Sequence, residues 1–300
     1  MAITDLELHS FVRLPTIADV LQTLADRHAA SQKTVVLAGG TDWVVEQEMA
    51  PPHKPGAELP MVVDISRLSD LQTIHLNGNL LTIGAAATYL QLRRHPHIGM
   101  GDKRAALLAR MAQDLGALQI QARGTLGGNL ATGSPAADGV AALMAYDASV
   151  VLQSVRGERT VPITEFQTGY KKSVRAPDEI ITQFQISLPT HYNWYWRKVG
   201  TRRAQAISKV ALAGVAVVES GQIQRIGLGM ASVAPVTAAL RNTRSYLCSA
   251  PLHKLTGAEL DAAVNSDCSP IDDVRSTRQY RAHCARVVVR EFARSLGAPV

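Results

Sequence analysis

Two glycine-rich stretches of this chain have the composition of segments that bind an anion. The first is AGGTDWVVE, Ala38–Glu46, and the second is TLGGNLATGSPAADG, Thr125–Gly139. Glycines permit a sharp turn and a close approach to a ligand, and successive unpaired backbone N–H groups form an anion-binding concavity. Thr41, Thr125 and Ser134 add hydroxyl donors. One such stretch alone is equally well explained as a structural turn, but two in one domain indicate a ligand with two phosphates.

Neither stretch has the spacing of the common nucleotide-binding motifs. Both the GxGxxG fingerprint of dinucleotide-binding units and the GxxxxGK[ST] pattern of P-loops are missing from them. The second stretch cannot be a regular helix or strand over its whole length, and long apolar segments flank it. We therefore predict a loop inside a folded domain, followed by a short helix at residues 139–144.

The elements that position these stretches alternate between strands and helices. Thr16 is a plausible N-cap for a helix at residues 17–28, and the strands TVVLAGG and MVVDIS flank the first stretch. Apolar residues in helical phase predict a helix over 103–120, which leads into the second stretch. Further strands are predicted for three segments, ASVVLQSV, TVPITEF and DEIITQFQISLP.

The pattern changes near Pro189. The segments WYWRKV, ALAGVAVVES and IQRIGLGMASV read as three strands, and helices follow to the end. We therefore predict an α+β fold of two domains, 1–189 and 190–300.

Composition restricts the class of protein and its compartment. The chain has 300 residues, 46% of them hydrophobic and 19% charged, which suits a folded core. No apolar run reaches the roughly 18 to 20 residues that span a bilayer, and no secretory signal is evident. Cys248, Cys268 and Cys284 match neither a disulfide framework nor a CxxC pair, so we expect the reducing cytoplasm.

The net charge of 31 − 25 = +6 does not indicate nucleic-acid binding. Basic residues are mostly dispersed, and aromatic residues make up only 5% of the chain. The segment Arg275–Arg294 gathers six arginines among apolar residues at helical spacing. It is interpreted either as an amphipathic helix with a solvated basic face or as a docking face for an acidic partner.

Four motifs in their order and spacing resemble one known family. AGGTD, GTLGGNLATGSPAAD, GYKK and RKVGTRRAQAISKV are similar to the FAD-binding subunit of the molybdenum hydroxylases, the xanthine dehydrogenase and carbon monoxide dehydrogenase family. The resemblance runs from about residue 8 to 295. It implies an FAD-binding domain of the vanillyl-alcohol oxidase type, with lobes at about 1–65 and 66–189. A smaller C-terminal domain of three antiparallel strands plus helices is expected to follow.

The resemblance also implies cofactors and partners. This chain would be an oxidoreductase subunit that binds FAD, with molybdopterin in a large subunit and two [2Fe–2S] clusters in a small one. The assembly would be a heterotrimer or a dimer of heterotrimers. Electrons would pass to an external acceptor (NAD, oxygen, a quinone or a protein) while the partner hydroxylates an N-heterocycle or an aldehyde. No catalytic acid–base residue is expected here, because the flavin carries the chemistry.

The resemblance assigns cofactor contacts to both glycine-rich stretches. Each double glycine is expected to cradle the pyrophosphate through backbone N–H groups. Side chains further along the second stretch are expected to contact the ADP or ribityl part. The expected cofactor-binding residues are Ala38, Gly39, Gly40, Thr41, Asp42, Thr125, Gly127, Gly128, Asn129, Ser134, Asp138 and Lys198. From the residues alone, Asp138 is also a candidate N-cap for the helix that follows.

Further residues are expected near the flavin. Tyr170, in GYKK, matches a tyrosine on the electron-acceptor side. The loop 199–209 matches a segment beside the flavin, where Arg202, Arg203 and Lys209 are candidates to raise its potential. Each of these three cations is equally well explained by solubility.

Departures from the family pattern and competing hypotheses narrow the prediction. One branch, the benzoyl-CoA-type reductases, carries an extra cluster on inserted cysteines, but no cysteine precedes Cys248 here. His95 and His97 lack a third ligand nearby, so no metal centre is predicted. The alternatives are a stand-alone flavoprotein similar to UDP-N-acetylmuramate dehydrogenase and a nucleotide-binding assembly module without redox turnover.

Overall fold

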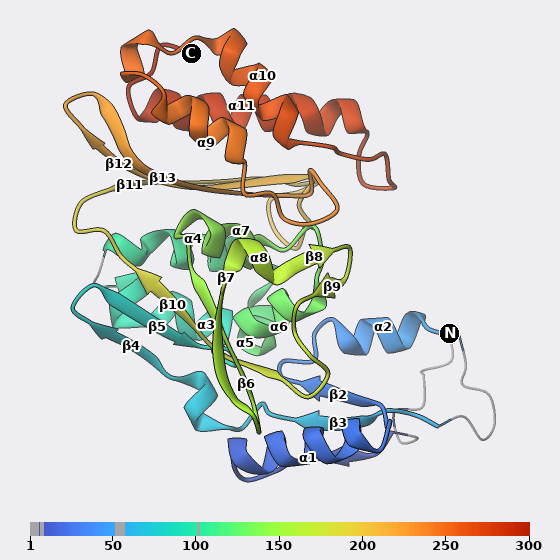
Figure 1. Cartoon of the computed structure of the whole chain (residues 1–300). Coiled ribbons are helices and arrows are strands. Elements are labelled where there is room, and N and C mark those ends of the chain that lie inside the picture. The colour runs from blue at the N-terminus through green and yellow to red at the C-terminus, as the bar shows by residue number, and fades with distance from the viewer. Residues whose placement is uncertain (1–5, 7–8, 52–57, 101–102) are drawn as a thin grey trace.

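The computed structural model describes residues 6, 9–51, 58–100 and 103–300. Its N-terminal lobe is a parallel sheet with the strand order β1-β3-β2 and one long helix against it (Figure 1). Thr16 caps that helix by accepting a hydrogen bond from the N–H of Asp19, as the sequence predicts. The elements of this lobe are β1 (Phe11–Val12), α1 (Ile17–Ala29), β2 (Thr34–Leu37), α2 (Trp43–Met49) and β3 (Met61–Asp64).

The second lobe is an antiparallel five-stranded sheet with the order β4-β5-β10-β6-β7, and helices cover it. Its strands are β4 (Ile74–Asn77), β5 (Leu80–Gly84), β6 (Ser149–Ser154), β7 (Gly157–Pro162) and β10 (Ile180–Ser187), with a hairpin of β8 (Gln167–Gly169) and β9 (Lys172–Ser173). Its α-helices are α3 (Tyr89–Arg94), α4 (Ala106–Asp114), α5 (Leu118–Arg123), α6 (Leu126–Thr132), α7 (Asp138–Ala145) and α8 (Ile163–Phe166).

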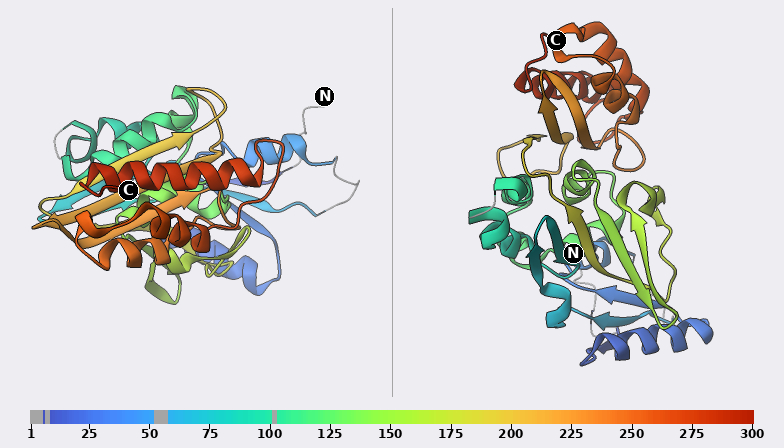
Figure 2. Two further views of the ribbon diagram at one scale, coloured as in Figure 1. Left: turned by 90° about the horizontal axis from the view of Figure 1, so that it is seen from above. Right: turned by 60° about the vertical axis from the view of Figure 1, so that its left-hand side comes forward.

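The C-terminal region is a three-stranded antiparallel sheet between two helical layers (Figures 1 and 2). Helix α7 packs closely on one face, since a Cβ on Gly227 or Gly229 would lie 2.1 or 2.2 Å from the carbonyl oxygen of Ala145 or Ala141. The other face packs against the C-terminal helices. The elements are β11 (Asn193–Val199), β12 (Val210–Glu219), β13 (Gln222–Ala231), α9 (Arg241–Cys248), α10 (Gly257–Asp267) and α11 (Arg278–Ser295).

This arrangement confirms the predicted α+β fold and the three-stranded antiparallel C-terminal sheet, while the boundary near residue 190 stays a prediction. Two local predictions are wrong. The single helix over 103–120 is interrupted, because Gly116 adopts a φ of +55° between α4 and α5. The predicted loop at the start of the second stretch is helix α6, which Thr125 caps and which Gly133 ends in the left-handed conformation.

The basic C-terminal segment is largely neutralised within its own domain. Arg290 lies 2.8 Å from Asp261, Arg278 lies 2.8 Å from Asp272, and the buried Arg281 lies 2.5 Å from Asp273. These contacts favour the interpretation as an amphipathic helix over that of a docking face for an acidic partner. None of the helices formed by the described residues is long and apolar enough to cross a membrane.

Candidate functional site

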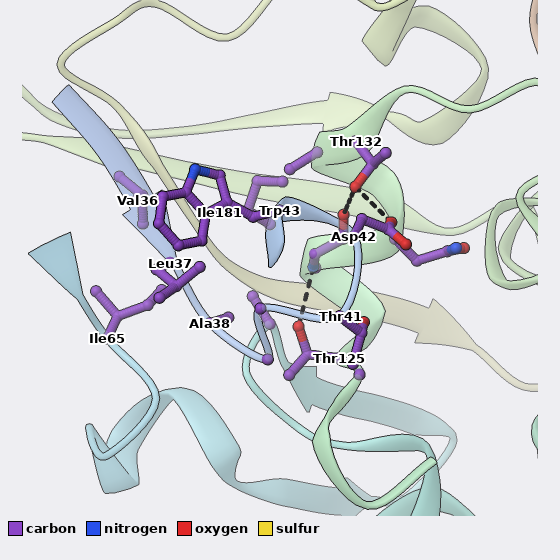
Figure 3. Close-up of a pocket in the computed structure, with 18 of the residues that line it drawn as sticks. Val36, Leu37, Ala38, Thr41, Asp42, Trp43, Ile65, Thr125, Thr132 and Ile181 are labelled. Atoms are coloured by element: carbon purple, nitrogen blue, oxygen red, sulfur yellow. Dashed lines mark hydrogen bonds between the residues drawn. The ribbon is translucent and has the colours of Figure 1, made fainter. Parts of the chain in front are cut away.

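The two glycine-rich stretches meet at one cavity (Figure 3). The turn Gly39–Asp42 follows β2, and Asp42 accepts a 2.8 Å hydrogen bond from the Thr132 hydroxyl at the end of α6. Gly39 lies directly against the segment before α6, because a Cβ there would come within 2.1 Å of the carbonyl oxygen of Arg123. Gly40 has a φ of +74°, which only glycine adopts readily. Both glycines of the first stretch are therefore required by the backbone.

The turn leaves its backbone donors free. The N–H groups of Gly39, Gly40, Thr41 and Asp42 donate no hydrogen bond to any residue that the structure describes. Gly39, Gly40 and Thr41 are half-buried, and N–H groups removed from water are almost always paired, so these free donors at a cavity indicate an acceptor outside the chain. The turn therefore has the donors that an anion requires.

The second stretch uses its donors internally. The N–H of Gly127 donates to the carbonyl of Ala85 at 2.8 Å, that of Gly128 to the Thr125 hydroxyl at 3.0 Å, and that of Asn129 to the Thr125 carbonyl at 3.0 Å. These N–H groups are thus already paired within the chain, and the expectation that they cradle a phosphate stays a prediction. The residues still line the cavity, and Gly127 is glycine because a Cβ would meet the Ala85 carbonyl at 2.6 Å.

The cavity beyond the turn is about 350 Å³ and mainly apolar. Figure 3 shows its side chains, which come from β2, α2, the residue after β3, and β10. They include Val36, Leu37, Trp43, Ile65 and Ile181. Two polar atoms nearby, Tyr89 Oη and Asn129 Oδ1, are buried without a partner among the described residues. Burial and the charges of Asp138 and Asp42 raise the pKa of Tyr89, so its hydroxyl is a neutral donor.

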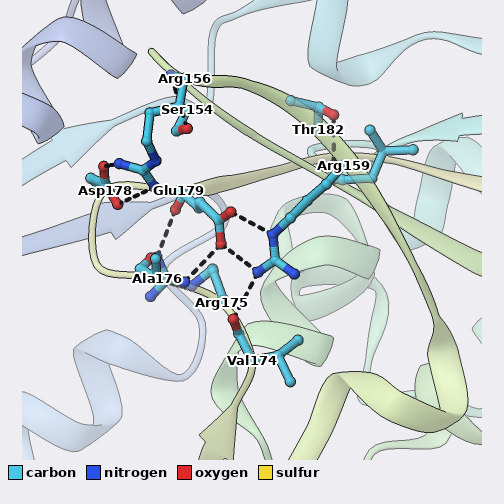
Figure 4. A network of polar contacts seen from close by, with 10 residues as sticks. Ser154, Arg156, Arg159, Val174, Arg175, Ala176, Asp178, Glu179 and Thr182 are labelled. Atoms are coloured by element: carbon cyan, nitrogen blue, oxygen red, sulfur yellow. Dashed lines mark hydrogen bonds and ion pairs between the residues drawn. The ribbon is translucent and has the colours of Figure 1, made fainter.

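Arg175 places a positive charge at this cavity, and sequence analysis did not identify it. Its loop is held rigid by Arg159, which binds Glu179 at 2.7 and 2.8 Å (Figure 4), and by Arg156, which binds Asp178. Arg175 itself contacts only carbonyl oxygens, including that of Glu179 at 2.7 Å. Burial lowers the pKa of Arg175. The guanidinium therefore lines the cavity without a carboxylate partner among the described residues.

A second cavity of about 1170 Å³ continues from the same turn toward the C-terminal sheet. It shares Thr41, Asp42, Asn129 and Thr132 with the first cavity, so the two form a continuous path. Ser134 lines the second cavity, and its hydroxyl accepts from the N–H of Ala136 at 3.2 Å. The path has a narrower end, free donors in the middle, and a wider end that is largely apolar but carries the charged side chains of Asp138, Lys198 and Arg202.

Asp138 and Lys198 form a buried ion pair in the wall of the second cavity. Lys198 Nζ lies 2.7 Å from Asp138 Oδ2, and the Ser208 hydroxyl donates to Asp138 Oδ1 at 2.6 Å. Burial raises the pKa of Asp138, and the ammonium and hydroxyl oppose that shift. The N-cap interpretation of Asp138 is wrong, because Ala137 is the N-cap of α7 and no side chain caps that helix.

The remaining predicted residues fall at the mouth of the second cavity or outside it. Tyr170 is 61% exposed and lines the second cavity. Arg202 also lines it and hydrogen-bonds carbonyls of its own loop. Lys209 lies over the Tyr280 ring at 5.1 Å, and neither it nor Arg203 lines the cavity. Only Arg202 of the three candidate cations thus reaches the predicted flavin site.

Comparison with known proteins gives the family. Residues 8–190 match the FAD binding domain in molybdopterin dehydrogenase, and residues 195–296 match the CO dehydrogenase flavoprotein C-terminal domain. The chain belongs to this family. Its cofactor is therefore FAD, and it is an oxidoreductase subunit of the molybdenum hydroxylase type.

Individual relatives agree with this assignment. The chain is 38% identical over 186 residues to the nicotinate dehydrogenase FAD-subunit of Eubacterium barkeri, a match that covers 61% of this chain and 60% of that protein. It is 28% identical to a putative xanthine dehydrogenase FAD-binding subunit of Escherichia coli over 94% of both chains. A carbon monoxide dehydrogenase structure from Hydrogenophaga pseudoflava shares the fold, with a TM-score of 0.85 at 22% identity over 94% of this chain and 95% of that one.

Proposed function

We propose that the chain binds FAD along the path formed by the two cavities. The ADP part lies in the apolar cavity, the pyrophosphate lies on the Gly39–Asp42 turn, and the flavin lies in the wider cavity. The row of free N–H groups at the junction of the two cavities is the observation that carries this proposal. The residues fit the group, because a dianionic pyrophosphate supplies the acceptors that these donors lack.

The chain's own residues bind and orient the cofactor. Arg175 supplies a positive charge at the ADP end, and its guanidinium forms no ion pair with a carboxylate of the described residues, although Glu179 lines the same cavity. Asp138, which also accepts a hydrogen bond from the Ser208 hydroxyl, fixes the Lys198 side chain in the wall of the flavin end. A positive charge beside the flavin favours its reduced anionic form, and the bound flavin supplies the electron-transfer chemistry.

We further propose that this subunit relays electrons within a complex. It would receive them from an iron–sulfur partner and pass them to an external acceptor at the mouth beside Tyr170. A molybdenum-containing partner would hydroxylate the substrate, an N-heterocycle or an aldehyde. The names of the nicotinate and xanthine dehydrogenase relatives support the N-heterocycle class.

The two alternative functions have less support. The match of residues 195–296 to the CO dehydrogenase flavoprotein C-terminal domain favours a subunit of that type over a stand-alone flavoprotein similar to UDP-N-acetylmuramate dehydrogenase. A non-redox assembly module would bind ADP without flavin. The larger cavity then has no occupant, although it continues directly from the turn.

Purification of the native complex tests the proposal. We expect a flavin and iron–sulfur absorption spectrum, molybdenum on metal analysis, and two further chains on a denaturing gel. A yellow chain that purifies alone, without iron or molybdenum, would contradict the electron relay but retain the FAD site. A colourless chain that added FAD does not colour would contradict the FAD site itself.

A further inference from the structure

A third cavity of about 680 Å³ lies against the Gly39 turn and is distinct from the FAD path. It shares only Ala38, Gly39 and Thr125 with the apolar cavity and no residue with the flavin cavity. The segment after β3, helix α3 with the residues that follow it, and the end of α5 supply most of its walls. Its charged and titratable lining residues are Arg67, Arg94, His95 and Arg123. We call it the arginine cavity.

The charge of the arginine cavity is unbalanced. None of its three arginines forms an ion pair with any residue that the structure describes, and no aspartate or glutamate is among its described lining residues. The nearby Asp64 is already bound by Arg13 at 2.5 Å and by the N–H of Ser66 at 2.8 Å. By contrast, Asp42, Glu46 and Glu179 all line the apolar cavity.

We propose that the arginine cavity binds a small polyanion, an oligophosphate or a polycarboxylate, through Arg67, Arg94 and Arg123. The planar guanidinium group has donors that match phosphate and carboxylate oxygens in pairs, and three of them around one cavity suit a ligand with several anionic groups. The cavity volume falls in the range of about 300–1,000 Å³ that is usual for small-molecule sites. A concave site of this size favours a small ligand over a flat protein surface.

The site is coupled by direct packing to the turn proposed to hold the FAD pyrophosphate. The backbone carbonyl oxygen of Arg123 packs so closely on Gly39 that a Cβ on Gly39 would lie only 2.1 Å from it. A ligand bound to the Arg123 side chain would therefore bear on the residue that packs against the turn. The proposal does not depend on FAD, but its test uses the FAD-loaded protein so that the turn is not available to the probe.

The test is calorimetric titration of the FAD-loaded protein with tripolyphosphate and, separately, with citrate. We expect saturable binding of one equivalent to the wild-type protein, and the stronger of the two probes identifies the phosphate or the carboxylate class. The double variant Arg94→Gln/Arg123→Gln should bind at least about tenfold more weakly, since hydrogen bonds to charged groups are among the stronger polar contacts. The single variant Arg67→Gln should show a smaller loss in the same direction.

The matched control removes the same charge elsewhere. Arg197 and Arg241 are exposed, form no ion pair with described residues and line none of the three cavities. The double variant Arg197→Gln/Arg241→Gln should leave the affinity within about twofold of the wild type, because salt screens the interaction of exposed charges outside the cavity with the ligand. Equal weakening in both double variants, or no saturable binding to the wild type, would overturn the proposal. Flavin absorbance of each sample reports separately whether the FAD site has failed.

Discussion

The Gly39–Asp42 turn and the start of helix α6 line the same cavity, yet they use their backbone donors in opposite ways. The turn leaves four successive N–H groups free among the described residues. The start of α6 pairs the N–H groups of Gly127, Gly128 and Asn129 with Ala85 and Thr125. Two stretches with similar composition therefore use their donors differently, and we propose that the first binds an anion while the second packs closely between the lobes.

The difference has a structural cause. After β2 the chain turns through Gly40 and enters α2, where no side chain caps the first N–H groups. At α6, Thr125 acts as an N-cap, and the end of β5 brings the Ala85 carbonyl to Gly127. Glycine composition signals close approach in both places, but it does not say whether the approaching group is a ligand or the protein itself.

The largest expected effect on cofactor affinity is at Gly39. In Gly39→Ala the new Cβ would lie 2.1 Å from the Arg123 carbonyl oxygen, so the turn must move. We predict that FAD affinity falls by about 100-fold, roughly 2.7 kcal/mol, in a fluorescence titration. Gly169→Ala is the control, because its nearest neighbour would be 3.9 Å away. Unchanged affinity in Gly39→Ala would remove the turn from the cofactor site.

Asp138, at the end of the second stretch, forms a buried ion pair with Lys198, and this pair offers a test of the structural role of the stretch. Lys198→Met leaves the carboxylate of Asp138 buried without its cation, and breaking such a pair costs about 3–5 kcal/mol. We predict that loss in the free energy of unfolding, measured by urea denaturation near pH 7.

The pH dependence of the same variant sharpens this test. Burial raises the pKa of Asp138, so the folded state binds more protons than the unfolded state. Without Lys198 to oppose the shift, stability should fall as pH rises from the unfolded-state pKa through the raised folded-state pKa. The double variant Asp138→Asn/Lys198→Met should lose this pH dependence. If the stability of the Lys198→Met variant did not change with pH, the assignment of a raised pKa to the buried Asp138 would be contradicted.

A smaller effect is expected at the N-cap of α6. Thr125→Val removes the acceptor of the Gly128 N–H and should lower the free energy of unfolding by about 1 kcal/mol. The matched control is Thr88→Val, because Thr88 caps α3 in the same way. FAD affinity should change less in Thr125→Val than in Gly39→Ala. The reverse order would make α6 the main contributor to phosphate binding.

The smallest effect is expected for Gly128→Ala. Its Cβ would lie 2.9 Å from the Thr125 hydroxyl oxygen, and no other atom outside its two chain neighbours and the backbone of its own helix would lie within 4 Å, so a small side-chain shift accommodates it. Alanine also gains up to about 1 kcal/mol of helix propensity over glycine. We predict flavin retention within about threefold of the wild type on gel filtration. Complete loss of flavin would show that Gly128 needs to be bare because the cofactor approaches it.

Local signals predicted much of the fold and part of the site. The cap at Thr16 and the three antiparallel C-terminal strands are confirmed, and both glycine-rich stretches do line one cavity. Local signals failed where tertiary contacts decide. The carbonyl of Ala85, which satisfies Gly127, lies outside the motif, and Lys198 is distant in sequence from Asp138. Arg175 lies in no recognisable sequence motif. Arg159 binds the carboxylate of Glu179, so Arg175 contacts only the backbone carbonyl of that residue.

Amide hydrogen exchange with and without FAD tests the central comparison most directly. Without FAD, the amides of Gly39, Gly40, Thr41 and Asp42 should exchange rapidly, whereas those of Gly127, Gly128 and Asn129 should be protected. Adding FAD should slow exchange at the turn and change little at α6. Rapid exchange at Gly127 and Gly128 that FAD suppresses, with no change at the turn, would contradict the account.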